Sequence, residues 1–130
     1  MVHCPWSIAN KDLMAFKFEK LKVWETSVDL SAEISDLVKS FPKDEIYVLS
    51  SQLKRACDSI SLNIAEDSTG QSNAESKKFL SYALRSAIEV VGCLYLAKKR
   101  NLVHQNSFDL FYTKLTELIK GIQALRNAIK

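Results

Sequence analysis

The C-terminal part of the chain carries the most regular apolar pattern. Apolar residues recur there at alternating steps of three and four: Phe108, Phe111, Leu115, Leu118, Ile122, Leu125 and Ile129. This spacing places them along one face of an α-helix, as in a heptad repeat. Asn106 is expected to cap the amino end, because its side chain can accept a hydrogen bond from a free backbone N–H. The pattern therefore predicts a helix over residues 106–129.

A helix with a wider apolar stripe is predicted over residues 73–100. Ser72 and Glu75 have the spacing of a capping box at its start, and Asn101 is the expected exit. A stripe of this width is typical of a helix that contacts two neighbours. Its members are Leu80, Leu84, Ala87, Val91 and Leu94, with Phe79, Ala83, Ile88 and Tyr95 beside them.

Two further helices are predicted over residues 18–40 and 42–68. Pro42 suits the first position of a helix, and it keeps Phe41 out of the α region, which ends the preceding helix. Gly70 marks the end of the second of these helices or the loop after it. The first should bury Leu21, Trp24, Val28, Ile34, Leu37 and Val38, and the second Ile46, Leu49, Leu53, Ala56, Ile60 and Ile64.

Four helices of similar length with short connections predict an all-α protein, an up-down-up-down antiparallel four-helix bundle over residues 16–130. Composition agrees, since 3 glycines and 2 prolines in 130 residues are too few for the many turns of an all-β domain. Residues 1–15 are expected to form a poorly ordered N-terminal extension. The length suits a single domain.

The sequence offers no targeting or membrane signal. It has no run of about eighteen apolar residues, and its first fourteen residues lack a basic start followed by an apolar stretch and a cleavage site. We therefore expect a cytoplasmic protein without membrane association. Cys4, Cys57 and Cys93 have no CxxC spacing and are expected to be small apolar residues in a reducing compartment.

Catalytic machinery is not visible in the sequence. It lacks a phosphate-binding glycine loop, a nucleophile elbow, an HExxH helix and any ExxH pair. The only histidines, His3 and His104, have no partners at metal-ligand spacing. We expect no enzymatic activity, no cofactor, no metal and no small-molecule substrate, and we predict that the protein acts by binding partners.

Charge is unevenly distributed along the chain. Residues 1–67 carry 8 basic and 11 acidic residues, whereas residues 68–130 carry 10 basic and 4 acidic residues. Three interpretations remain open: basic helices packed beside acidic ones, subunits meeting head to tail in a ring, or a basic surface that faces phosphates. The candidate contacts for nucleic acid or another partner are Lys54, Arg55, Lys77, Lys78 and Arg85. A rotation of 100° per residue prevents the last three from all sharing one face.

Some apolar residues and two glycines do not fit a lone bundle. Gly92 and Gly121 lie inside predicted helices, where each costs about 0.8–1 kcal/mol relative to alanine. Such glycines usually mark a close helix approach, within the subunit or against another copy. Outside the stripes lie Val48, Tyr82, Val90 and Tyr112, which indicate either self-association or ordinary scattered surface residues.

Polar residues flank the stripe of the predicted helix 42–68. We expect Arg55, Asn63 and Glu66 to pair across helices, for instance with Glu89 or Arg85, in a network that fixes helix register. The other interpretation of these residues is a ligand or partner surface.

The same region carries a family resemblance. Residues 41–45, 49–56, 59–60 and 63–66 resemble the signature of the four-helix-bundle proteins encoded in 23S ribosomal RNA intervening sequences. Residues 18–25 resemble the opening of that family and residues 79–89 its third helix, so that the likeness spans about residues 16–125. Ser61, Asp67 and Arg85 depart from the family, which commonly has proline, glycine and glycine at these positions.

The resemblance implies a ring-like homopentamer. Related retroelement accessory proteins are basic pentamers that bind nucleic acid and a reverse transcriptase. Our first hypothesis is a non-enzymatic oligomeric scaffold or accessory protein that contacts RNA or a ribonucleoprotein partner through basic surfaces. The alternative is a protein–protein interaction module with no nucleic-acid role.

Overall fold

The computed structural model describes residues 16–69 and 72–130, and all regular structure in these two ranges is helical. The predictions for residues 1–15 and for Gly70 lie outside the described residues. In chain order the elements are η2 (Lys17–Lys20), α2 (Lys22–Val38), η3 (Lys43–Glu45), η4 (Ile46–Ser50), α3 (Ser51–Asp67), α4 (Asn73–Lys99) and α5 (Gln105–Asn127). The prediction of an all-α chain with four long helices is confirmed.

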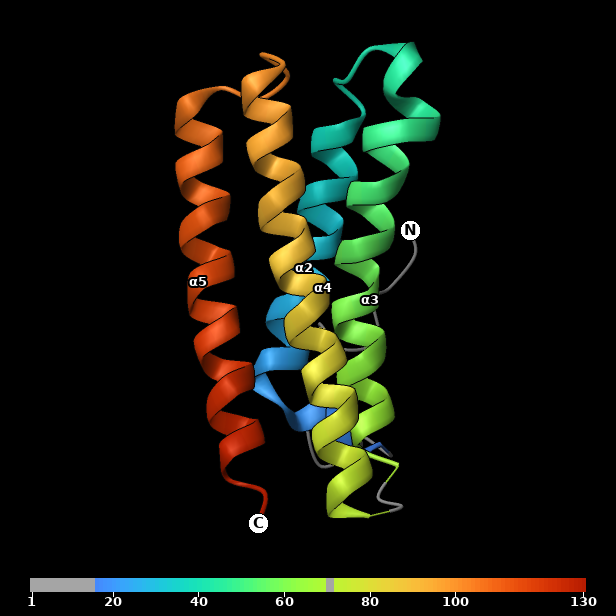
Figure 1. Ribbon diagram of the computed structural model, residues 1–130, viewed down its shortest axis with the longest axis vertical. Coiled ribbons are helices and arrows are strands. Elements are labelled where there is room, and N and C mark those ends of the chain that lie inside the picture. The colour runs from blue at the N-terminus through green and yellow to red at the C-terminus, as the bar shows by residue number, and fades with distance from the viewer. Residues whose placement is uncertain (1–15, 70–71) are drawn as a thin grey trace, which may run out of the picture.

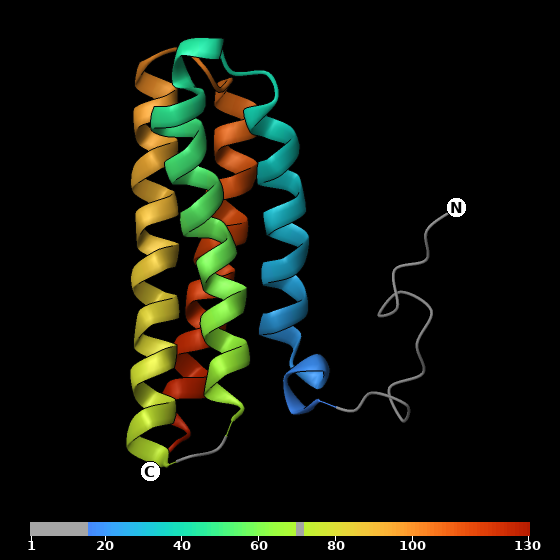
Figure 2. The same ribbon diagram turned by 90° about the vertical axis from the view of Figure 1, so that its right-hand side faces the viewer.

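The four α-helices lie side by side, and consecutive helices run in opposite directions (Figures 1 and 2). The closest neighbours are α2 with α3, α3 with α4, α4 with α5, and α5 with α2. Each helix therefore has two neighbours, an inner face toward the core and an outer face. The beginning of α3 and the end of α4 lie at the same end of the molecule (Figure 1).

The stripe predicted for the last helix is buried in α5. Phe108, Phe111, Leu115, Leu118 and Ile122 are buried, while Leu125 and Ile129 pack against the core at its edge. Burying one such side chain stabilises the fold by about 1.5–3 kcal/mol. The helix begins at Gln105 with His104 at its N-cap, and not at Asn106 as predicted. The side chain of His104 makes no capping hydrogen bond, and Asn106 lies inside the helix.

The inner face of α4 is rotated relative to the prediction. Val90 is fully buried although it was assigned outside the stripe, and Ile88, assigned to the stripe, is 61% exposed. Alanines at positions 83, 87 and 97 are completely buried and turn toward the interior together with Val90. These small side chains let neighbouring backbones approach closely, so the buried face is the one rich in alanine.

Both ends of α4 lie where the sequence predicts them, within one residue. The Ser72 hydroxyl accepts a hydrogen bond from the Glu75 N–H at 3.1 Å, as expected of an N-cap serine. At the other end Asn101 adopts a left-handed conformation with φ of 61°. The N–H of Leu102 donates to the carbonyl of Ala97 at 2.8 Å, and that of Asn101 to Lys98 at 3.0 Å. This pair of bonds is the Schellman motif, which terminates the helix.

The segment that precedes α3 differs from the prediction of a continuous helix from Pro42. The chain forms a short 3₁₀ turn in η3 and a π-helical turn in η4, and regular α-helix begins at Ser51. A π turn bonds i to i+5 and so holds one residue more than an α turn, which changes the phase of the preceding residues. Ile46, predicted to be in the core, is 48% exposed as a result, whereas Leu49 remains buried.

The two helical glycines have different surroundings. A Cβ added at Gly121 in α5 would lie 2.8 Å from Cγ1 of Val23 in α2, so this glycine permits the two helices to approach. A Cβ added at Gly92 in α4 would meet no atom within 4 Å. Gly121 therefore has a packing role within the subunit, and Gly92 has none.

Alanine substitution should separate these two roles. Gly92→Ala is expected to stabilise the folded subunit by about 0.8–1 kcal/mol through helix propensity alone. Gly121→Ala gains the same propensity but forces Val23 to move, at a cost of about 1–3 kcal/mol for overpacking. Urea unfolding of both variants should therefore rank Gly121→Ala below Gly92→Ala. Equal stabilities would contradict the close contact of α5 with α2.

Candidate interaction surfaces

The five predicted basic contacts are distributed over two helices. Lys54 and Arg55 are exposed in the first turns of α3, and Arg85 is exposed in the middle of α4. Lys77 and Lys78 lie in the first turns of α4, at the opposite end of the molecule from the start of α3 (Figure 1). Lys78 and Arg85, seven residues apart, share one face of α4, whereas Lys77 is turned aside and partly buried. The predicted basic residues therefore form two groups, one at the start of α3 and one on α4, and not one continuous patch.

The outer face of α4 combines positive charge with apolar side chains. We define it by its exposed residues, which are Lys78, Tyr82, Arg85, Ile88, Glu89, Gly92, Tyr95, Leu96 and Lys99. Three cations and one carboxylate give this face a net charge of +2. Among the described helices, α4 is the one whose length and composition would allow it to cross a membrane. Helices in the core of a protein meet the same criterion. Seven residues of α4 are buried inside the bundle, and the absence of a membrane role stays a prediction.

Every cation–aromatic contact among the described residues uses a cation of α4. The guanidinium of Arg85 lies 5.8 Å from the ring centre of Tyr82, and the ammonium of Lys98 lies 5.6 Å from that of Tyr95. Lys78 makes a similar contact with Phe79 at 5.3 Å. Such pairs hold a positive charge beside an aromatic face, which is the combination that single-stranded nucleic acid requires.

An aromatic cluster closes the end of α4 against the start of α5. Phe108 is buried beneath Tyr95 and Tyr112, with ring centres 4.9 and 5.9 Å away. The Lys98 ammonium lies 4.3 Å from the centre of the Phe108 ring. This contact joins α4 to α5, because Lys98 and Phe108 are ten residues apart in the chain and lie in different helices.

The turn η4 exposes three consecutive apolar side chains beside the start of α3. Tyr47 is 93% exposed, and Ile46 and Val48 are about half exposed. An open groove on each side of α3 reaches Tyr47 and Arg55, one toward α4 and one toward α2. The α3–α4 groove is lined by Tyr47, Val48, Ser51, Gln52, Arg55, Ala56, Ser59, Ser86 and Glu89. The α2–α3 groove is lined by Ser35, Val38, Lys39, Ile46, Tyr47, Ser50, Ser51, Lys54, Arg55 and Asp58.

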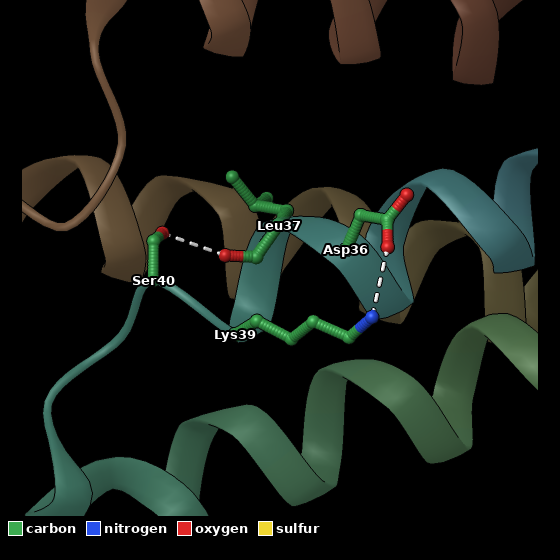
Figure 3. Close-up of polar contacts among 4 residues, drawn as sticks. All are labelled: Asp36, Leu37, Lys39 and Ser40. Carbon is green, nitrogen blue, oxygen red and sulfur yellow. Dashed lines mark hydrogen bonds and ion pairs between the residues drawn. The ribbon is translucent and has the colours of Figure 1, made fainter.

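Lys39 lies on the rim of the α2–α3 groove, at the end of α2. Figure 3 shows its ammonium reaching back to the carboxylate of Asp36, at 3.1 Å, while the Ser40 hydroxyl donates to the carbonyl of Leu37 at 2.7 Å. Both charged side chains are about three-quarters exposed. Surface pairs of this kind contribute at most about 1 kcal/mol, so Lys39 can turn toward an anion at little cost.

Ser50 lies in the wall of the α2–α3 groove and is an exception among buried polar groups. The residue is 5% exposed, and its hydroxyl has no hydrogen-bond partner among the described residues. Leaving a buried hydroxyl unsatisfied costs about 1–3 kcal/mol. The sequence analysis did not identify this residue, because its neighbours along the chain do not indicate that its hydroxyl lacks a partner.

The residues predicted to form a polar network are placed differently. Asn63 donates to the hydroxyl of Ser59 at 3.0 Å, and Ser59 is joined to Ser86 of α4 at 2.9 Å. Glu89 accepts a longer bond from Gln52 at 3.4 Å. Asn63 and Glu89 therefore do take part in links between α3 and α4, through serine and glutamine partners.

The other two predicted members, Arg55 and Glu66, make hydrogen bonds within their own segment. The Arg55 guanidinium donates to the hydroxyl of Ser51 at 3.4 Å, and the Glu66 carbonyl accepts from the hydroxyl of Thr69 at 2.9 Å. Among the described residues no hydrogen bond joins Arg55 or Glu66 directly to Glu89 or Arg85. Their charged groups are left available on the surface of α3.

The two cysteines of the described region are buried and free, as predicted. Burial raises the pKa of the Cys57 thiol to about 11, against a weaker opposing hydrogen bond from Ser31. Burial, together with the Glu89 carboxylate, also raises the pKa of Cys93. Both thiols are therefore protonated at neutral pH and poor nucleophiles. No group of three or more histidine, cysteine or acidic residues in the described ranges could hold a metal ion.

The raised pKa of Cys57 predicts a loss of stability in base. The pKa of this thiol in the folded protein lies above its ordinary value of 9.0, so its contribution to stability is fully present below pH 9 and is lost as the pH rises through about 11. The loss amounts to about 2–3 kcal/mol. Urea unfolding between pH 8 and pH 11 should show a smaller decline for Cys57→Ala than for the unmodified protein. Parallel declines would contradict the assignment.

Comparison with known proteins supplies the family. A family model described as 23S rRNA-intervening sequence protein matches residues 19–124. A crystal structure of a protein with unknown function from the S23 ribosomal protein family of Bacteroides thetaiotaomicron is 25% identical, with a TM-score of 0.75, over 81% of this chain and 95% of that chain. No curated protein matches, and neither description above names an enzymatic activity. The chain therefore belongs to the family of 23S rRNA-intervening sequence proteins.

Proposed function

We propose that this protein is a non-enzymatic scaffold or accessory protein that acts in the cytoplasm as a homo-oligomer and contacts RNA or a ribonucleoprotein partner. In this proposal the subunit is an up-down-up-down antiparallel bundle, and the family resemblance suggests a pentamer. Its core is filled with apolar side chains, so that partners are bound on the outer surface.

The observation that carries the proposal is the outer face of α4. Three cations of α4, Lys78, Arg85 and Lys98, lie next to aromatic rings at its beginning, middle and end, and Lys98 borders this face beside Tyr95. Cations attract the phosphates of RNA, and exposed tyrosine rings offer faces on which unpaired bases stack. Lys54 and Arg55 at the start of α3 would extend the contact, because this end of α3 lies beside the end of α4 (Figure 1).

Removal of α4 charges should change the salt dependence of RNA binding. With a fluorescent single-stranded RNA, affinity is expected to fall steeply between 50 and 200 mM salt, because each phosphate contact releases a counterion. Lys78→Gln with Arg85→Gln should reduce the slope of log K against log salt by about 1.4, or about 0.7 for each contact. Fluorescence anisotropy at several salt concentrations measures both quantities.

The control is Lys20→Gln with Lys120→Gln, which removes the same charge from exposed positions on η2 and α5. This variant should keep the slope of the unmodified protein. Equal slopes for all three proteins would contradict a role for α4, and salt-insensitive or absent binding at micromolar protein would contradict the RNA contact itself.

A second candidate function is a protein–protein interaction module with no nucleic-acid role. The observation that favours it is the apolar part of the α4 outer face, where Ile88 and Leu96 are 61% and 47% exposed on either side of Gly92. The open space above Gly92 would accommodate a close approach by another helix. Burial of this face between subunits would leave its cations inaccessible to RNA, so RNA binding discriminates between the two proposals.

Self-association through α4 predicts a specific loss of assembly. Ile88→Asp should lower the mass measured by size-exclusion chromatography with light scattering, because a carboxylate would be buried in the apolar contact. Leu110→Asp on α5 is the matched control, since Leu110 is exposed to a similar extent outside this face. An unchanged mass for Ile88→Asp would show that the subunits meet elsewhere or not at all.

A further inference from the structure

The α2–α3 groove has features that the proposed contact along α4 does not explain. It has a volume of about 540 Å³, within the range of about 300–1,000 Å³ that is typical of ligand sites. We propose that this groove binds a nucleoside phosphate, with the base against Tyr47 and the phosphate between Lys54 and Arg55. If the nucleotide belongs to an RNA chain, the inference rests on the proposed function, and the groove binds one nucleotide of that RNA.

The charges around the groove favour an anion. Lys39, Lys54 and Arg55 line it, with Asp58 as the one acidic residue in its lining. Within residues 16–69 and 72–130, the side chain of Arg55 makes only a long bond of 3.4 Å to Ser51, and that of Lys39 only its exposed pair with Asp36. These cations are thus available to a phosphate, for which a guanidinium is well suited.

The exposed ring of Tyr47 adds the feature that distinguishes a nucleotide from a simple anion. Tyr47 lines the groove and is 93% exposed, so that a ring face is open for stacking. Its position results from the π turn of η4, and π turns inside helices are frequent at functional sites. Ring stacking and a phosphate contact together match a nucleoside phosphate.

The test uses the full chain and three probes: adenosine 5′-monophosphate, adenosine and inorganic phosphate. Calorimetric titration should detect binding of the monophosphate. Adenosine and inorganic phosphate should each bind at least about tenfold more weakly. Tyr47→Ala should lower the affinity for the monophosphate by about 5- to 150-fold, the range expected for loss of one stacked base. Tyr47→Phe should keep the affinity, and Phe16→Ala, which removes an exposed ring distant from the groove in sequence, should leave it unchanged.

Arg55→Gln tests the phosphate contact. It should weaken binding of the monophosphate at least about threefold and leave binding of adenosine unchanged, because adenosine carries no phosphate. Unchanged affinity in both Arg55→Gln and Tyr47→Ala would overturn the inference, as would equal binding of inorganic phosphate and the monophosphate.

An RNA arm distinguishes the two sources of the nucleotide. A single-stranded RNA that loses affinity in Tyr47→Ala supports the groove as part of the RNA contact. RNA binding that is unaffected by Tyr47→Ala, combined with no detectable monophosphate binding, would overturn the inference and leave the proposed function standing. Monophosphate binding without any RNA binding would support the groove and contradict the RNA contact.

Discussion

The close packing of α3 against α4 is the contact on which the rest of the arrangement depends. These two helices contact each other more extensively than any other pair of described elements, and the short side chains of Ser59 and Ser86 bond directly between them at 2.9 Å. This contact determines how α4 is rotated about its own axis, turning Val90 into the core and Ile88 outward. The chemical character of the outer face of α4, both apolar and basic, is therefore a consequence of how its inner face packs.

Features that depend on nearby residues could be predicted from the sequence. The stripe of α5 follows from the period of the helix, and the ends of α4 follow from the side chain of Ser72 and the tolerance of asparagine for the left-handed conformation at Asn101. Lys54, Arg55 and Arg85 could also be identified as exposed, because a charged side chain beside an apolar stripe is rarely buried.

Features that depend on distant residues could not be predicted. Val90 is buried and Ile88 is exposed because of how α4 packs against α3. The apolar pattern of α4 alone does not show this packing. The unpaired hydroxyl of Ser50 and the contact of Lys98 with Phe108 appear only once the helices are in place. The interhelical polar links use Ser59, whose short side chain gave no indication of that role.

The π turn of η4 has a consequence for how this surface can vary among related chains. Because such a turn holds one more residue than an α turn, a chain shorter by a single residue here could continue α3 back toward Pro42 as regular helix. Ile46 would then return to the interior, and the aromatic ring at the mouth of the groove would be displaced. A one-codon insertion or deletion here would therefore shift this ring relative to the core beneath it.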